Sequence, residues 1–211
     1  MKNASNATTA AGYGAPVQPG CTPARRRVDA VQNRDRLLDA AEAVFLAGGT
    51  NVALDVVAAR AGVGRATLFR NFPDRHALIV GLLERTLEEL EMEAARVDAD
   101  PGALQRLLRW AAERMVSRAP LHEYWRAAAH DSPDLQAAIQ RFVAAFERPI
   151  AWAIAQGRCR QDLVPADILL FVSMLSGVLH GRTTAEKRLL ADRAWTFIEA
   201  SAQLSSRPAH K

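Results

Sequence analysis

Residues 54–72 read LDVVAARAGVGRATLFRNF, and this stretch decides the fold. Two helices that meet at a steep angle over a short turn need a small residue where their backbones approach, and Ala58 meets this need. Four positions later the turn needs a residue that tolerates left-handed backbone geometry, which Gly62 does because it has no Cβ. We therefore expect two short helices, one on each side of a turn at 62–64.

The apolar residues of the same stretch agree with helices over 54–61 and 65–71. Val57, Val63 and Leu68 have the spacing of residues that face inward from the two helices and from the turn between them. A DNA-binding helix-turn-helix and a purely structural helical hairpin share this pattern, so the pattern alone leaves both interpretations open.

The segment before this stretch is also helical in its pattern. Apolar residues recur there at three- and four-residue spacing, at Leu37, Ala41, Val44 and Phe45. Together with Gly48 and Gly49, which act as a stop signal, this spacing predicts a helix over about 33–47.

The segments that follow predict more helices and no strand. Pro73 ends the second helix of the motif because its ring disfavours helical geometry at the preceding residue. Asp74 is a candidate N-cap for a long helix that reaches about Val97. Further helices are expected over about 103–118, 121–130, 134–156, 166–181 and 185–203. Pro149 should kink or divide the third of these. Because no run alternates apolar and polar residues as a strand does, we expect an all-α fold.

The charge of the chain is distributed unevenly. Residues 1–80 hold ten basic and six acidic groups, whereas residues 81–211 hold 17 of each, so the whole net charge of +4 lies in the first part. Such an asymmetry is expected if the first part meets a polyanion and the second part does other work.

Membrane insertion and export are not expected. The longest apolar stretch, Ile168 to Leu179, is shorter than the ~18 residues that a membrane span requires. Residues 1–32 lack the apolar segment of a secretory signal, so we expect a cytoplasmic protein. Cys21 and Cys159 lie far apart and are expected to be free thiols.

The stretch AARAGVGRATLFRNFPDRHALI, Ala58 to Ile79, resembles the N-terminal domain of the TetR/AcrR family of transcriptional regulators. The resemblance implies an N-terminal three-helix helix-turn-helix domain that is joined by a long helix to a helical ligand-binding and dimerisation domain. The corresponding divisions are a disordered N-terminal arm at 1–32, the DNA-binding domain at 33–80 and the second domain at 81–211.

The resemblance makes residues 65–71 the recognition helix, which enters the major groove of a double-stranded DNA operator by its N-terminal end. The DNA-binding residues would be Thr50, Arg65, Ala66, Thr67, Phe69, Arg70 and Asn71. Arg65 would bind a phosphate or form two parallel hydrogen bonds with a guanine. Thr67 would cap the helix, donate to a phosphate or touch a thymine methyl group.

Two positions of this helix depart from the family pattern. Phe69 stands where the family usually has Tyr, so only apolar contact with a sugar or a thymine methyl group remains. Asn71 stands where His is frequent and would still hydrogen-bond oxygens of the DNA backbone. Arg70 would face solvent or a phosphate, and we favour the phosphate.

The residues that flank the motif are also assigned through the resemblance. Arg75 stands where the family commonly has a phosphate-binding Lys, in the first turn of the long helix. Ala53 stands at a cap position that usually holds Ser or Thr, so Thr50 or Asn51 would cap a longer helix, or Asp55 would act on the helix dipole.

Arg25, Arg26 and Arg27 precede the first predicted helix. Two interpretations stay open for them: a solvated charge run in a disordered tail, or an arm that inserts into a narrow minor groove.

The second domain is expected to bind a small-molecule effector. Aromatic and polar residues that would line its cavity are Trp110, Met115, His122, Tyr124, Trp125, Phe142, Phe146 and Trp152. Each of them has the alternative of being an ordinary core residue, because helical spacing would produce the same set.

The last two helices carry apolar stripes that would pair with those of a second copy. The stripes are Phe171, Leu175, Val178 and Leu179 on one helix, and Leu190, Ala194, Phe197 and Ile198 on the other. The resemblance implies a homodimer through these helices, a palindromic operator, and repression that a small molecule relieves through the long helix.

Other functional classes have little support in the sequence. No metalloprotease, P-loop or nucleophile-elbow pattern is present, so we expect no enzyme, no metal and no cofactor. The alternative function is a helical interaction protein or a small-molecule-binding protein that does not bind an operator.

Overall fold

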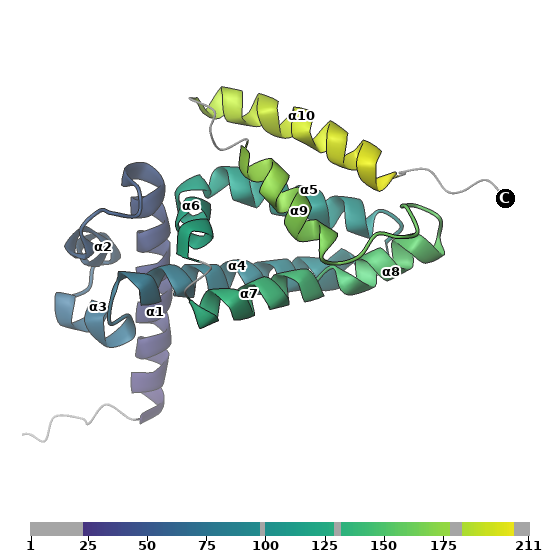
Figure 1. Ribbon diagram of the computed structural model, residues 1–211. Helices are drawn as coiled ribbons and strands as arrows, with labels where there is room; N and C mark the ends of the chain where they lie inside the picture. Colours follow the sequence, from purple (N-terminus) through teal and green to yellow (C-terminus); the bar gives the residue numbers. More distant parts are fainter. Residues whose placement is uncertain (1–22, 98–99, 129–131, 178–182, 205–211) are drawn as a thin grey trace, which may run out of the picture.

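The computed structural model describes residues 23–97, 100–128, 132–177 and 183–204. Within these ranges all regular secondary structure is helical, so the expected all-α fold is confirmed (Figure 1). The helices are α1 (Pro23–Gly48), α2 (Leu54–Ala61), α3 (Arg65–Asn71), α4 (Arg75–Val97), α5 (Ala103–Ser117), α6 (Ala119–Ala128), α7 (Pro133–Ala144), α8 (Glu147–Ala155), α9 (Asp167–Ser176) and α10 (Thr184–Ala202).

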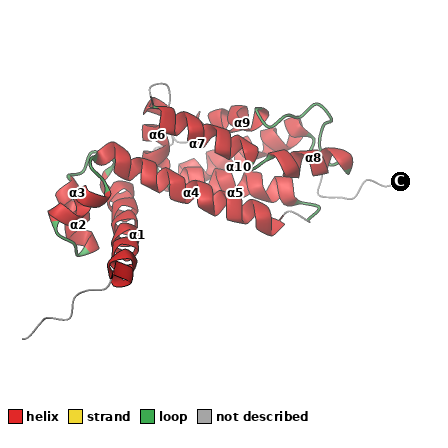
Figure 2. Ribbon diagram, turned by 90° about the horizontal axis from the view of Figure 1, so that it is seen from below, coloured by secondary structure: helices red, strands yellow, loops and turns green. Residues whose placement is uncertain are grey.

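The helices form an elongated molecule with α2 and α3 at one end (Figures 1 and 2). α1 stands across that end, and α4 runs from it along the rest of the molecule beside α5 and α7. α10 lies on the side of the bundle opposite α4. The two short helices of the motif therefore project away from the bundle that α5 to α10 form.

Two hydrophobic clusters hold these helices together. The first, the head cluster, gathers residues of α1 to α4 and includes Leu121 and Trp125 of α6. The second, the bundle cluster, gathers residues of α4 to α10. α4 contributes to both, with Ile79 in the head cluster and Leu90 in the bundle cluster. Consequently α4 and α6 are packed against the head and the bundle at the same time.

The predicted start of the first helix was wrong. α1 begins at Pro23, ten residues before the expected start, so the backbone of residues 23–32 is helical where a disordered arm was expected. Residues 29–32 are all exposed, and the prediction relied on apolar periodicity, which an unpacked helical segment does not need to have. Pro23 stands at the first helical position, where its missing N–H costs no hydrogen bond.

The expected helix at 134–156 is divided in two, as Pro149 predicted. α7 ends at Ala144 and α8 begins at Glu147, which places Pro149 in the first turn of α8. The other boundaries agree with the expected ones to within a few residues. The exception is the end of the helix expected at 166–181: α9 ends at Ser176, and residues 178–182 lie outside the described ranges.

The predicted dimer stripes face the wrong way in part. Phe171, Leu175 and Ile198 are buried in the bundle cluster of the same chain, and Val178 and Leu179 lie outside the described residues. Of the predicted stripes, Leu190 and Phe197 of α10 are exposed, and Leu170, Met174 and Leu189, which were not predicted, are exposed with them. On α9 the error arose because nearly every residue is apolar, so spacing could not tell the inner face from the outer one.

Arg118, between α5 and α6, is the most deeply buried charged side chain of the described residues, with 5% exposure. Its Nε donates to Glu42 of α1 at 2.6 Å, and its Nη1 donates to Thr86 and Glu89 of α4 at 2.8 and 3.2 Å. Arg85 of α4 also donates to Glu42, at 2.5 Å. This ionic network ties α1 and α4 to the start of α6.

Arg118→Met should destabilise the protein strongly. The substitution removes the cation that Glu42 and Glu89 share and leaves them with Arg85 and Arg114 respectively, and losing one partner of a largely buried ion pair costs about 3 kcal/mol. The free energy of unfolding, from urea denaturation, checks this. Arg96→Met is the matched control, because Arg96 pairs with Glu93 in an exposed position and its loss should leave the urea midpoint nearly unchanged. Equal effects of the two substitutions would contradict the role given to Arg118.

Candidate functional site

The turn between α2 and α3 has the geometry that the sequence predicts. Gly62 adopts a left-handed conformation with φ of 67°, and its N–H donates to Ala59 O at 3.2 Å. The N–H of Val63 donates to Ala58 O at 3.1 Å, which completes the closure of α2. The turn thereby satisfies the last carbonyls of α2 and redirects the chain into α3.

The inward-facing residues of the motif are buried as expected. Val57 and Leu68 are 0% and 1% exposed, Ala58 is also buried, and all three belong to the head cluster. Val63 packs partly against the same cluster. The packing against α1 therefore sets the orientation of both short helices.

The opposite face of α3 is open to solvent. Arg65, Ala66, Phe69 and Arg70 are exposed, and Thr67 is half-buried. Arg65 pairs with Asp55 at 3.1 Å and lies 5.4 Å from the centre of the Phe69 ring. Exposed ion pairs contribute little free energy, so this guanidinium is available to a stronger anionic partner.

Two polar side chains of α3 bond within the helix. Arg70 Nη2 donates to Thr67 Oγ1 at 3.0 Å, and both side chains lie next to the exposed face. Asn71 Nδ2 donates to Thr67 O at 2.8 Å, so this half-buried side chain folds back onto its own helix. Asn71 therefore stabilises the end of α3, a contribution that the predicted DNA contact did not anticipate.

Arg75 has a structural partner that the sequence did not reveal. Its Nη1 donates to Val52 O at 2.7 Å and also to Thr50 O, and its guanidinium lies 6.0 Å from the ring centre of Phe45. The half-buried side chain thus holds the loop between α1 and α2 against α4. The expected outward contact of Arg75 with a phosphate is not the contact that this geometry favours.

The helix ends near the motif show which caps form. α2 begins at Leu54 with Ala53 as its N-cap and no side-chain capping bond, so of the two alternatives the longer helix capped by Thr50 or Asn51 does not form, whereas Asp55 does lie in the first turn. Asp74 does cap α4, because its Oδ1 accepts from Ala77 N at 2.7 Å. The bonds from Arg75 hold the loop ahead of α2 where a capping side chain is missing.

The N-terminal arginines can be placed only by their backbone. Arg25, Arg26 and Arg27 lie in the first turns of α1, and their side chains are outside the described part of the structure. Their backbone is helical rather than an extended tail.

The eight residues predicted to line one cavity are divided among several places. Met115, His122 and Phe142 line an enclosed cavity of about 40 Å³ between α5, α6, α7, α9 and α10. Tyr124 and Trp125 pack against the head cluster, and Phe146 is 0% exposed in the bundle core. Trp152 is half-buried on α8. The sequence identified α5, α6 and α7 as walls of this cavity, but it missed α9 and α10 and included α8, which does not line it.

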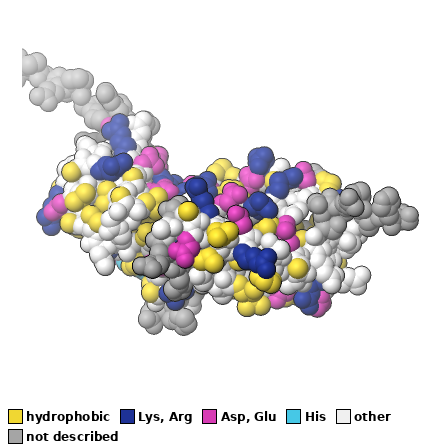
Figure 3. Space-filling view, turned by 90° about the horizontal axis from the view of Figure 1, so that it is seen from above, with side chains coloured by type: hydrophobic (Ala, Val, Ile, Leu, Met, Phe, Trp, Pro, Cys, Tyr) yellow, Lys and Arg dark blue, Asp and Glu magenta, His cyan; other side chains and the backbone are white. Residues whose placement is uncertain are grey.

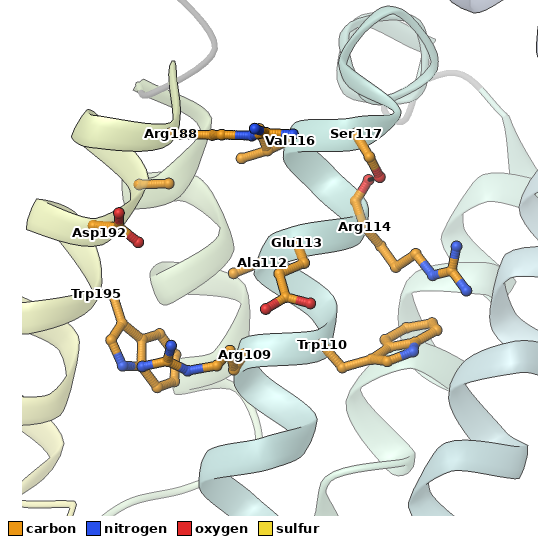
Figure 4. Close-up of a pocket in the computed structure, with 11 residues that line it drawn as sticks. Arg109, Trp110, Ala112, Glu113, Arg114, Val116, Ser117, Arg188, Asp192 and Trp195 are labelled. Carbon is orange, nitrogen blue, oxygen red and sulfur yellow. Dashed lines mark hydrogen bonds between the residues drawn. The ribbon is translucent and has the colours of Figure 1, made fainter. Parts of the chain in front are cut away.

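Trp110 lines a separate open groove of about 740 Å³ between α5 and α10 (Figure 4). The ring centre of Trp110 lies 5.1 Å from the guanidinium of Arg114. On the other side of the groove, the ring centre of Trp195 lies 5.1 Å from the guanidinium of Arg109. Charged side chains of both signs, including Glu113 and Asp192, surround the two rings (Figure 4). The groove is thus wider and more polar than the enclosed cavity.

Two residues that line the enclosed cavity each have a buried polar atom without a partner among the described residues, His122 Nε2 and Trp195 Nε1, and Trp195 also borders the open groove. Burial, and to a smaller extent the positive charge of Arg118, lowers the pKa of His122 to about 4. The imidazole is therefore neutral near neutral pH. Trp195 was not among the predicted cavity residues, because its place on the last helix pointed to the dimer contact.

α6 connects this cavity to the head. His122 lies edge-on to Trp125, with ring centres 4.8 Å apart, and Trp125 Nε1 donates to Ile79 O of α4 at 3.4 Å. Tyr124 OH lies 3.1 Å from His76 Nδ1, also on α4. α6 is therefore bonded directly to the first turns of α4.

The described ranges contain neither a metal-ion cluster nor a membrane-spanning helix. No cluster of three or more His, Cys, Asp or Glu residues there has an arrangement that would hold a metal ion. No described helix combines the length and the apolar character that crossing a membrane requires.

Residues 37–82 match the family described as "Bacterial regulatory proteins, tetR family". A TetR regulator from Mycobacterium vanbaalenii is 29% identical and covers 84% of this chain and 98% of its own, with a TM-score of 0.60. A TetR regulator from Streptomyces coelicolor is 26% identical, covers 84% of this chain and 99% of its own, and has a TM-score of 0.61. SmeT, the repressor of the Stenotrophomonas maltophilia efflux pump SmeDEF, shares the fold at 21% identity, 84% and 94% coverage and a TM-score of 0.57. No curated protein matches the chain.

The neutral state of His122 should make stability depend on pH. Above pH 6.5 the imidazole is neutral in the folded and the unfolded chain, and its contribution is complete. Between pH 6.5 and about 4 only the unfolded chain takes up the proton, so stability should fall, by roughly 3 kcal/mol for a shift of this size. Urea denaturation between pH 7.5 and 4.5 measures this, and His122→Phe should lose the part of the decline that is due to residue 122. A parallel decline in both proteins would contradict the buried neutral imidazole.

Proposed function

We propose that this chain, which belongs to the tetR family of bacterial regulatory proteins, represses transcription by binding a palindromic DNA operator and is released from it by a small molecule. The proposal places residues 33–80 in the DNA-binding domain and residues 81–211 in the ligand-binding and dimerisation domain. It places the protein in the cytoplasm, where it meets DNA, and assigns it no catalysis.

The observation that carries the proposal is the exposed face of α3. Arg65, Phe69 and Arg70 project from it, while Leu68 on the opposite side holds the helix in the head cluster. A short helix fixed in this way, with cationic side chains on its free face, fits the major groove of B-DNA. The net positive charge of the first 80 residues supports the same assignment.

Within this face the residues have different roles. Arg65, at the N-terminal end of α3, reaches a guanine edge or a phosphate, and its pairing with Asp55 is exchanged for the DNA contact. Phe69 and Ala66 make apolar contacts with a sugar or a thymine methyl group. Arg70 and Thr67, already bonded to each other, bind a phosphate together.

The flanking residues have supporting roles in the proposal. Thr50 contributes a backbone contact from the loop that Arg75 holds, so Arg75 acts chiefly by positioning this loop. Asn71 terminates the recognition helix. Arg25, Arg26 and Arg27 extend α1 beyond the packed head and add positive charge next to the DNA.

In this proposal a second copy of the chain is needed to bind both halves of the operator. The outer faces of α9 and α10 expose Leu170, Met174 and Phe197 at 57%, 47% and 56%, a set that a second copy related by a two-fold axis would cover. Apolar side chains lie among charged ones on the side of the molecule that carries α10 (Figure 3). Such a dimer presents two copies of α3 about 34–36 Å apart, one turn of DNA, and so prefers an inverted repeat.

Release by a small molecule rests on the position of α6. SmeT, which shares this fold, has been crystallised as a complex with triclosan. In this chain an occupant of the bundle would move α6 and, through Trp125, the first turns of α4. A difference of 1–3 kcal/mol between two arrangements is enough to change operator affinity 5- to 150-fold.

Arg65→Ala should weaken operator binding by roughly 5- to 150-fold, because one bidentate base contact contributes about 1–3 kcal/mol. A duplex selected from random sequences with the intact protein serves as the operator, and gel-shift titration measures affinity. Arg96→Ala is the control, since Arg96 is an exposed arginine of α4 outside the head. An operator affinity of Arg65→Ala that equals the affinity of Arg96→Ala would overturn the role of α3. Absence of any salt-dependent binding by the intact protein would favour a helical interaction protein instead.

Phe197→Glu should convert the dimer into a monomer. The substitution removes one apolar contact of about 1.5–3 kcal/mol from each half of a two-fold interface, so the dissociation constant should rise at least 100-fold. Light scattering after size-exclusion chromatography reports the mass. Met92→Glu is the matched control, because Met92 is 65% exposed on α4, on the other side of the bundle from α10. A dimer that persists in Phe197→Glu would show that another face pairs.

A further inference from the structure

The enclosed cavity of the bundle has an apolar wall with two polar points. Leu108, Met115, Phe142 and Phe171 are typical of its lining, and only His122 and Trp195 carry polar side-chain atoms there. An apolar enclosure of this kind favours an apolar occupant, and the polar points determine how that occupant is oriented.

Both polar points lack a partner in the described part of the chain. Trp195 Nε1 and His122 Nε2 are inaccessible to solvent, and neither bonds to a described residue. An indole N–H only donates, so it requires an acceptor, whereas a neutral imidazole nitrogen accepts or donates according to its tautomer. A hydroxyl group satisfies either atom, because its oxygen accepts and its proton donates.

The charge of the lining excludes ionised occupants. No Asp, Glu, Lys or Arg side chain lines the cavity, and burial together with Arg118 keeps the pKa of His122 at about 4. The nearby Arg118 is already bonded to Glu42, Thr86 and Glu89. An ion in this enclosure would lose its hydration without gaining a counter-charge.

The size of the cavity limits the occupant to a small molecule. Its volume of about 40 Å³ exceeds the roughly 10–15 Å³ that one water requires but is far below that of sites for drug-sized ligands. Met115, with its flexible side chain in the wall, allows a modest enlargement. An apolar cavity that binds benzene measures about 150 Å³, so a single ring with one polar substituent enters here only if Met115 and the helices around it move apart.

We infer that this cavity binds a small, uncharged molecule with an apolar body and one hydroxyl group, which accepts from Trp195 or bonds to His122. The inference rests on the proposed function in that this molecule is the effector. His122, which this molecule would contact, lies against Trp125, and the indole of Trp125 bonds to Ile79 O of α4. Binding in the cavity therefore changes the packing of the head cluster. The open groove, with its arginines and carboxylates, suits neither the size nor the polarity of such a molecule.

Isothermal titration of the full chain with three probes of similar size tests the inference. Phenol has the ring and the hydroxyl, toluene replaces the hydroxyl by a methyl group, and benzoate adds a negative charge. Phenol should bind roughly 3- to 10-fold more tightly than toluene, as one net hydrogen bond implies, and benzoate should not bind measurably. This comparison needs no variant and so does not depend on how a substitution affects folding.

Two variants then locate the hydroxyl contact. His122→Phe keeps a ring beside Trp125 but removes the ring nitrogens. The ratio of the affinity for phenol to the affinity for toluene should therefore fall towards one. Tyr124→Phe, which removes one polar atom from the same helix outside the cavity, should retain the preference. Trp195→Phe provides the same test for the indole N–H if phenol bonds there instead.

Three results would overturn the inference. They are the absence of phenol binding, tighter binding of benzoate than of phenol, and a phenol preference that survives in both His122→Phe and Trp195→Phe. A gel shift on the selected duplex is measured separately, so the two proposals fail independently. Loss of DNA binding with intact phenol binding refutes the regulator, and intact DNA binding without phenol binding refutes the cavity assignment.

Discussion

A guanidinium that is 5% exposed cannot remain unpaired, and the arrangement of the helices depends on how Arg118 is paired. Its partners are Glu42 on α1 and Glu89 on α4, while its own carbonyl accepts from the N–H of His122 in α6. Moving any of these helices separates buried opposite charges. Since α2 and α3 are packed on α1, the orientation of the reading helix relative to the bundle is tied to this one side chain.

The same region connects the two ends of the molecule mechanically. α6 lines the enclosed cavity through His122 and enters the head cluster through Leu121 and Trp125. α4 likewise contributes to both clusters. Each of these helices is therefore packed against the head and against the bundle at the same time. The proposed release by a small molecule would use this connection.

Sequence reasoning succeeded where the cause of a structure is local. The left-handed turn at Gly62, the cap at Asp74 and the division of a helix near Pro149 follow from backbone chemistry within a few residues. It failed where a partner comes from elsewhere in the chain. Arg75 was given a phosphate but bonds to carbonyls of a loop more than 20 residues away, and Trp125 was given a ligand but packs on α4.

The amino-acid sequence by itself determined that the chain is helical, where the two short helices of the motif lie and that the free face of α3 is cationic, because periodicity, turn chemistry and charge are properties of short segments. The tertiary structure decided which face of α9 and α10 is turned outward, which of the predicted aromatic residues meet around one cavity, and that His122 and Trp195 share it. A helix that is apolar on nearly every side, as α9 is, carries no sequence signal for its rotation about the axis. Only packing against the neighbouring helices determines it.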